Sequence, residues 1–92
     1  MTRAEQIMRA VAHLTTMQGY REFSREDVRR HLNIDREIWN KSLTAIFQGM
    51  REDQPGGAPP VGESYVGVFR RVRHGRFILT DKGQSLVEEL GI

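Results

Sequence analysis

One segment constrains the fold more than any other. Residues 65–79 read YVGVFRRVRHGRFIL, in which apolar and aromatic residues lie on both sides of a glycine. Gly75 follows Arg73 and His74, and a glycine there can supply the positive φ that a tight hairpin turn needs. We therefore predict strands at 65–72 and 76–79, joined by a turn at 73–75.

The apolar residues of this hairpin indicate its buried face. Phe69, Val72, Phe77 and Leu79 are the predicted inward residues. Phe69 and Val72 differ in parity, so a strict two-residue alternation cannot bury both of them. We expect a β-bulge or a strong twist between the two.

The same segment carries four arginines, at positions 70, 71, 73 and 76, and no acidic residue. These four leave 10 of the 14 basic side chains to face 12 acidic ones elsewhere in the chain. A local excess of this kind favours a polyanionic partner more than the net charge of +2 does. The alternative is a solvated hairpin whose arginines only keep an edge strand soluble.

Composition limits the class of protein. Ninety-two residues correspond to one domain, 1–92, and 38% hydrophobic with 28% charged residues is typical of a globular, water-soluble chain. There is no cysteine, which excludes disulfides and thiolate metal sites. The first ten residues are charged and lack the apolar stretch of a signal peptide, and no apolar run is long enough to cross a membrane. We expect a cytoplasmic protein without membrane contact.

Helical periodicity and capping patterns predict three helices before the hairpin. Thr2 with Glu5 predicts a capping box and a helix over 3–17 that ends near Gly19. Ser24 with Asp27 predicts a second, short helix. It has outward-facing residues at 25, 26, 29 and 30 and ends at 33. A third helix is predicted over 36–49, with its buried face formed by Trp39, Leu43, Ile46, Phe47 and Met50.

The second and third helices are joined only by residues 33–35, as in a helix-turn-helix unit, whose second helix lies in the major groove of DNA. The polar face of helix 36–49 carries side chains that can reach phosphates or base edges. They are Arg36, Asn40, Lys41, Thr44 and Gln48. The alternative interpretation is the ordinary solvated face of an amphipathic helix.

Residues 51–64, REDQPGGAPPVGES, contain all three prolines and three of the nine glycines, which predicts a long loop. It is either a functional loop or a tether to the hairpin. After the hairpin, Thr80 predicts the start of a final helix to about Leu90, with residues 86, 87 and 90 turned inward. Gly83 is expected to weaken the first turn of that helix.

The order of these elements resembles the winged helix-turn-helix superfamily, and the ending GRFILTDKG at 75–83 is similar to its wing-to-helix junction. The segments FSREDVRR, IFQGMR, QPGGAP and GVF resemble a small uncharacterised family of prokaryotic winged-helix-like domains, found alone or beside restriction and modification enzymes. This resemblance implies an α+β fold with a three-helix core, a β-hairpin wing and a C-terminal helix. It assigns no binding residues, and fold by itself does not fix function.

An enzyme is not expected from this inventory of residues. His13, His31 and His74 are far apart in the sequence and form neither an H-E-x-x-H helix nor a close pair, so no metal site is predicted. The stretch GGAPP at 56–60 lacks the Gly-Lys-Ser/Thr ending of a phosphate-binding loop. No serine lies in the motif of an activated nucleophile. We expect no catalysis, no cofactor and no small-molecule substrate.

The sequence therefore predicts a non-catalytic DNA-binding module with a regulatory or restriction-associated role. Helix 36–49 would enter the major groove, and the wing would contact the backbone or minor groove of double-stranded DNA. The predicted wing residues are Arg71, Arg73, His74 and Arg76. A domain this small binds DNA weakly unless it is paired or tethered, so we expect a homodimer or an effector protein. The rival hypothesis is a winged-helix module that binds another protein and no DNA.

Overall fold

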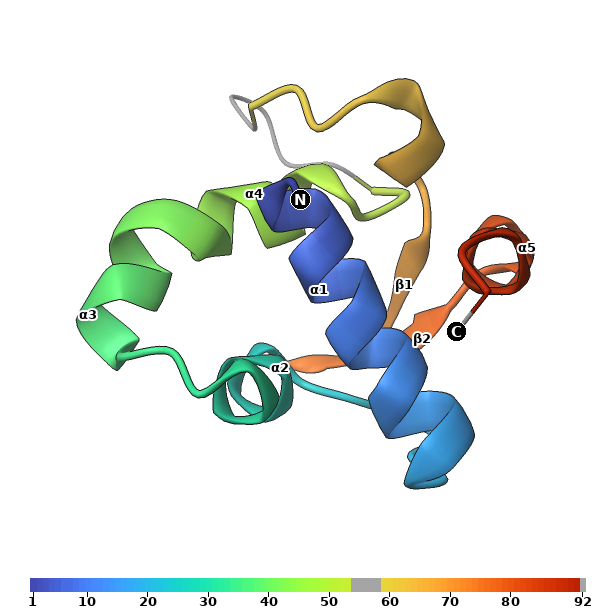
Figure 1. The fold of residues 1–92 in the computed structure, drawn as a ribbon, viewed down its shortest axis with the longest axis horizontal. Helices are drawn as coiled ribbons and strands as arrows, with labels where there is room; N and C mark the ends of the chain where they lie inside the picture. The colour runs from blue at the N-terminus through green and yellow to red at the C-terminus, as the bar shows by residue number, and fades with distance from the viewer. Residues whose placement is uncertain (54–58, 92) are drawn as a thin grey trace.

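The chain folds as a set of helices packed around a two-stranded antiparallel hairpin, which makes it an α+β protein (Figure 1). The computed structural model describes residues 1–53 and 59–91. The predicted loop 51–64 lies partly outside them, because 54–58 are not described. Among the described residues, no helix combines the length and apolar character needed to span a bilayer.

The first helix has the predicted extent. It begins as α1 (Arg3–Ala12), where the Thr2 side chain accepts a hydrogen bond from the backbone N–H of Glu5. It continues through a π-helical turn, η1 (His13–Met17). Gly19 follows with φ of 73°, a conformation that most other residues avoid. The capping residue and the glycine thus fix both ends of this helix locally.

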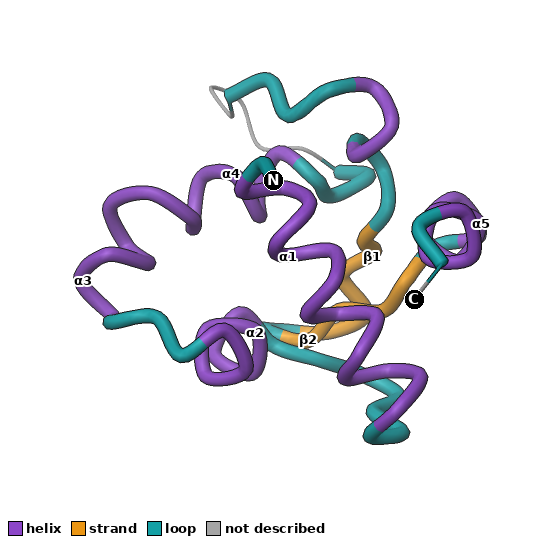
Figure 2. The backbone as a smooth tube through the Cα atoms, in the orientation of Figure 1, coloured by secondary structure: helices purple, strands orange, loops and turns teal. Residues whose placement is uncertain are grey.

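The second and third helices form a tight corner, visible at the lower left of Figure 2. α2 (Arg25–Leu32) starts with a complete capping box between Ser24 and Asp27 and ends at Asn33, whose φ is 55°. The next helix, called helix 36–49 below, consists of α3 (Arg36–Ile38), a π-helical turn η2 (Trp39–Leu43) and α4 (Thr44–Gly49). Asp35 caps it by accepting from the N–H of Glu37, 2.8 Å away. The capping box of α2 and the predicted extent of helix 36–49 are confirmed.

The hairpin is shorter than predicted and buries fewer of its side chains. Its strands are β1 (Phe69–Arg73) and β2 (Arg76–Leu79), so the first strand begins at 69 and not at 65. Residues 63–65 form a short 3₁₀ turn, η3 (Glu63–Tyr65). Gly75 has φ of 69°, as a tight turn requires.

Val72 corrects the predicted buried face. The register of the hairpin shifts between Arg71 and Arg73, which is the expected irregularity. Val72 is the residue left out of register, and its exposed fraction is 42%. The bulge thus resolves the parity conflict by turning Val72 outward, not by burying it beside Phe69.

Short backbone pairings extend the hairpin on both sides. Phe23, just before α2, exchanges two hydrogen bonds with Phe77 of β2, at 3.0 and 2.8 Å. On the other side Arg51 pairs with Phe69 in a parallel bridge, and the N–H of Glu52 donates to the carbonyl of Phe69 at 2.8 Å. The start of α2 and the end of helix 36–49 are therefore joined to the hairpin through the backbone.

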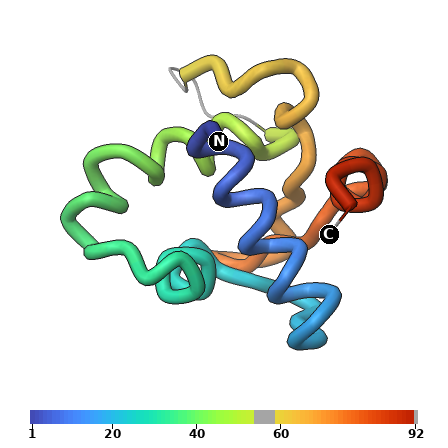
Figure 3. Tube along the Cα trace, viewed as in Figure 1, coloured from blue at the N-terminus to red at the C-terminus, as the bar shows by residue number. Residues whose placement is uncertain are grey.

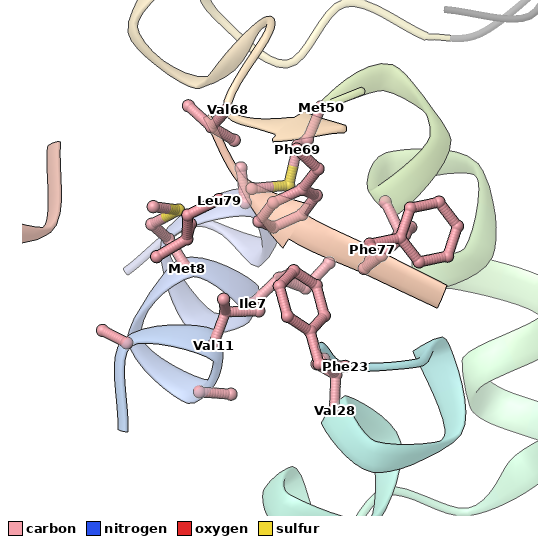
Figure 4. Packing of buried hydrophobic residues seen from close by; sticks show 14 of the residues in the cluster. Ile7, Met8, Val11, Phe23, Val28, Met50, Val68, Phe69, Phe77 and Leu79 are labelled. Atoms are coloured by element: carbon pink, nitrogen blue, oxygen red, sulfur yellow. The ribbon is translucent and has the colours of Figure 1, made fainter. Parts of the chain in front are cut away.

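An aromatic cluster joins the hairpin to the helices (Figure 4). The rings of Phe47 and Phe69 stack with centroids 4.9 Å apart, and Phe77 meets Phe47 edge-on at 5.0 Å. Phe23 lies edge-on to Phe69 at 5.2 Å. Pairs of this geometry add about 0.5–1.5 kcal/mol beyond their buried area. The cluster fixes the hairpin's orientation relative to helix 36–49.

The last helix, α5 (Asp81–Glu89), lies at the opposite side of the molecule from α3 (Figure 3). Thr80 caps it as predicted, and Leu86 and Val87 are buried. A Cβ on Gly83 would lie 2.4 Å from the carbonyl oxygen of Val68. Whatever it costs in helix propensity, Gly83 is what allows α5 to approach the hairpin this closely.

Candidate nucleic-acid interface

A cleft of about 410 Å³ lies where three elements meet: the start of α2, helix 36–49 and the hairpin turn. The hairpin contributes Gly75. The helices contribute Arg25, Glu26, Arg29, Arg36, Asn40 and Thr44. Polar and cationic groups of α2 and helix 36–49 are therefore brought to one surface beside the hairpin turn.

The predicted residues of helix 36–49 separate into two groups. Arg36, Asn40 and Thr44 line the cleft, with Asn40 exposed and Thr44 half-buried. Lys41 is exposed outside it and forms an ion pair with Glu37 at 3.0 Å. Gln48 is half-buried. The structure thus places three of the five at the meeting point with the hairpin.

Gln48 leads to an arginine that the sequence analysis missed. The Gln48 Oε1 atom accepts a hydrogen bond from Nη1 of Arg51 at 2.6 Å, and the Arg51 guanidinium lies 5.4 Å from the centroid of the Phe77 ring. Arg51 also donates two hydrogen bonds to the Asp53 carboxylate, at 2.9 and 2.8 Å. This arginine therefore braces helix 36–49 against the hairpin. Its position just after a helix gives no sequence signal for that role.

Three of the four hairpin arginines are paired with acidic side chains from other elements. Arg70 donates to Glu52 at 2.7 Å. Arg73 donates to Glu22 at 2.9 Å. Arg76 lies 3.6 Å from Asp27, the acidic member of the α2 capping box. The positive excess of the segment is thus largely neutralised once the chain folds.

Arg71 is the exception among the four. It forms no ion pair within residues 1–53 and 59–91, and its Nη2 lies 3.5 Å from Nδ1 of His74. Its partner in the ladder is Phe77, so it lies on the face of the hairpin that turns toward helix 36–49. The Arg51 hydrogen bond lowers the pKa of Asp53, and the charges of Arg51 and Arg71 add to that effect.

A cluster of four charged groups lies at the corner between α2 and helix 36–49, called the α2 corner below. Its members are Glu26, Arg29, Arg30 and Arg36, and the sequence did not predict it. Arg29, Arg30 and Arg36 all lie near Oε1 of Glu26. Hydrogen bonding to Arg29 is the main cause that lowers the pKa of Glu26, and the charges of Arg29 and Arg36 add to it. The i, i+3 and i, i+4 spacing on α2 was a readable signal for two of these contacts. The third contact comes from Arg36, which lies on α3, so spacing within α2 could not predict it.

Arg29 also corrects the prediction that it points outward. Its side chain is only 17% exposed, and its Nη1 donates to the carbonyl oxygen of Ile34 at 2.9 Å. It therefore ties α2 to the segment that leads into helix 36–49.

The histidines differ from the prediction in one respect. His13 and His31 are exposed, but their ring centroids are 4.8 Å apart, although 18 positions separate them in the sequence. The packing of α1 against α2 produces this pair. Among residues 1–53 and 59–91 there is no group of three or more side chains suited to holding a metal ion.

The chain matches no protein-family model, and comparisons with curated proteins and with solved structures found no match. The cleft and the charges around it are therefore the features of this chain that bear on its function.

Proposed function

We propose that this chain is a winged helix-turn-helix domain that binds double-stranded DNA and has no catalytic activity. In this proposal α2 and helix 36–49 form the helix-turn-helix unit, and the hairpin is the wing. The short corner at Asn33 and Asp35, the hairpin after the third helix and the closing α5 support that assignment. The proposal includes membership of the prokaryotic winged-helix-like family, with a cytoplasmic and regulatory or restriction-associated role.

The observation that carries the proposal is the shared cleft. Helix 36–49 and the turn of the hairpin both line it, through Asn40 and Gly75, and Arg25 and Arg36 line the same cleft. A duplex groove needs a projecting helix and a neighbouring cationic edge on one surface, because base edges and phosphates lie side by side. Here Asn40 of helix 36–49 and the cationic side chains of Arg25 and Arg36 lie on the same surface.

In the proposed complex helix 36–49 enters the major groove. Asn40 and Thr44 contact base edges, since an amide and a hydroxyl suit them, while Arg36 and Lys41 contact phosphates. Arg71 contacts the backbone beside that groove or the minor groove. With 4 to 6 phosphate contacts, the logarithm of the binding constant falls with the logarithm of salt concentration at a slope of about −4 to −5.

The test is fluorescence anisotropy of a labelled DNA duplex over a salt series. It compares the wild type with Arg25→Ala/Arg36→Ala in the cleft and with Arg3→Ala/Arg9→Ala on α1. Both variants lose two positive charges, so a general charge effect weakens them equally. We expect the cleft variant to lose at least tenfold in affinity, and the α1 variant to lose less than threefold.

A protein-binding winged helix is the second candidate, and the neutralised hairpin favours it. Three of its four arginines already have acidic partners. Ile38 and Val72 are also exposed, at 50% and 42%. Absence of any DNA binding by the wild type at low salt would replace the DNA proposal with this one. Light scattering with and without duplex tests the expected homodimer.

A further inference from the structure

Three arginines converge on one carboxylate oxygen of Glu26, a residue that lines the cleft. Oε1 of Glu26 lies 2.7 Å from Nε of Arg29, 3.6 Å from Nε of Arg30 and 3.4 Å from Nη2 of Arg36. Arg25 lines the same cleft and forms no ion pair within the described part of the chain. Within the cleft lining one negative charge, that of Glu26, therefore faces the three positive charges of Arg25, Arg29 and Arg36.

The three partners of Glu26 are not equivalent. Arg29 is mostly buried and is held by the carbonyl oxygen of Ile34, so it stays in place. Arg30 and Arg36 are 70% and 68% exposed, and each reaches Glu26 by a long contact. Exposed pairs of this kind contribute little to stability and exchange readily. These two guanidinium groups are free to take another anion in place of the carboxylate.

A phosphodiester is the anion that fits them best. A guanidinium group presents five N–H donors in a fixed plane that suits phosphate as well as carboxylate oxygens. The cleft lies between the helix proposed to enter the groove and the turn of the hairpin, where the DNA backbone would pass in the proposed complex. The surplus of positive charge remains after Glu26 is counted.

We propose that Arg25, Arg29 and Arg36 of this cleft, together with Arg30, which reaches Glu26 from outside the cleft lining, form a phosphodiester-binding site, and that Glu26 is its internal competitor, holding Arg30 and Arg36 in the free protein. This inference rests on the proposed function for the identity of the occupant. It adds a named position for one DNA phosphate and a residue of this chain that weakens binding there. Replacing Glu26 by a neutral residue of the same size should therefore strengthen binding.

The decisive variant is Glu26→Gln, which keeps the length of the side chain and an oxygen that accepts from Arg29. The matched control is Glu5→Gln, because Glu5 also forms an ion pair with an arginine but lies on α1 outside the cleft. Both variants gain one unit of net charge. Circular dichroism and thermal unfolding check that each remains folded.

Two probes are used: a labelled DNA duplex in the anisotropy assay, and inorganic pyrophosphate in a thermal-shift titration. We expect Glu26→Gln to bind both about fivefold more tightly than the wild type, as for removal of a like charge several ångströms from the ligand near a protein surface. Glu5→Gln should change either affinity by less than about twofold, because that charge is screened. Adding Arg36→Gln to Glu26→Gln should remove most of the gain, because the two residues act on the same ligand.

The outcomes separate this inference from the proposed function. Equal affinities of Glu26→Gln and Glu5→Gln for both probes would overturn the inference, even if the wild type binds DNA. If the wild type and Glu26→Gln both fail to bind DNA, the proposed function fails. In that case a tighter pyrophosphate complex of Glu26→Gln alone would still support an arginine anion site with Glu26 as competitor, and an unchanged one would end both proposals.

Discussion

The arginines of the hairpin and those of the α2 corner differ in how they meet acidic partners. The hairpin arginines are adjacent in the sequence, but in the fold Arg70, Arg73 and Arg76 each turn to an acid from a different segment. At the α2 corner, arginines from two helices gather around the single carboxylate of Glu26. The hairpin arginines are therefore dispersed by folding, while the arginines of two successive helices become concentrated around one carboxylate.

The physical reason lies in the geometry of the two elements. Successive side chains of a strand point to opposite faces, so neighbouring arginines of β1 diverge. Residues three and four positions apart on a helix share a face, so Arg29 and Arg30 both reach Glu26. A count of charges along the chain is therefore a poor guide to the surface that an anion meets.

The largest expected effect is a loss of stability when the buried face of the hairpin is altered. Phe77→Ala removes the ring that contacts Phe23, Phe47 and the guanidinium of Arg51. It should lower the free energy of unfolding by about 3–5 kcal/mol, measured by urea denaturation. Val72→Ala, an exposed position in the same hairpin, serves as control and should cost less than about 0.5 kcal/mol. Similar losses in the two variants would contradict the assigned inward face.

The next effect concerns the support behind the hairpin. Gly83→Ala places a methyl group 2.4 Å from the carbonyl oxygen of Val68 and 2.9 Å from Cδ2 of Leu79. The resulting displacement of α5 should cost about 1–3 kcal/mol in thermal unfolding. Ser85→Ala, an exposed position of the same helix, should be near neutral. A stabilised Gly83→Ala protein would mean that helix propensity outweighs packing at this site.

A smaller effect, on DNA affinity, is expected to distinguish two neighbouring arginines of the hairpin. Arg71 lacks an acidic partner in the described residues and lies on the face toward helix 36–49, whereas its neighbour Arg70 is paired with Glu52. Arg71→Ala should weaken DNA binding about fivefold and reduce the salt slope by about 1. Arg70→Ala should change affinity by less than about twofold. The reverse order in the anisotropy assay would show that the other face of the hairpin meets the DNA.

The smallest effect is a pH dependence from the α2 corner. The pKa of Glu26 is lowered in the folded protein, chiefly by its hydrogen bond to Arg29, so the ionised carboxylate contributes stability above its ordinary value of 4.5. That contribution is lost as the pH falls below 4.5 and through the lower folded pKa. Thermal unfolding between about pH 6 and pH 3 should therefore show a smaller acid destabilisation in Glu26→Gln than in the wild type. Identical acid profiles would argue against the convergence of the arginines on Glu26.

The sequence alone determined the features that depend only on neighbouring residues. The capping side chains of Thr2, Ser24, Asp35 and Thr80 each satisfy a backbone N–H within three residues, so the starts of the helices follow from adjacent letters of the sequence. The apolar stripe of helix 36–49 also follows from its spacing alone. The turn at Gly75 does too, since glycine tolerates the positive φ of 69° that it adopts there.

Only the tertiary structure decided which charges from distant parts of the chain meet. The pairing of Arg73 with Glu22 spans 51 positions, and that of Arg70 with Glu52 spans 18. The contact between His13 and His31 depends on the packing of α1 against α2, and the exposure of Val72 depends on a bulge set by strand register. An ion pair between distant residues is too weak to direct the fold, so its partners are chosen by where packing of the aromatic core leaves them. For that reason the candidate site keeps Arg36, Asn40 and Thr44, which the sequence predicted on helix 36–49, but adds cationic groups of α2, while three of the four hairpin arginines are paired with acidic residues.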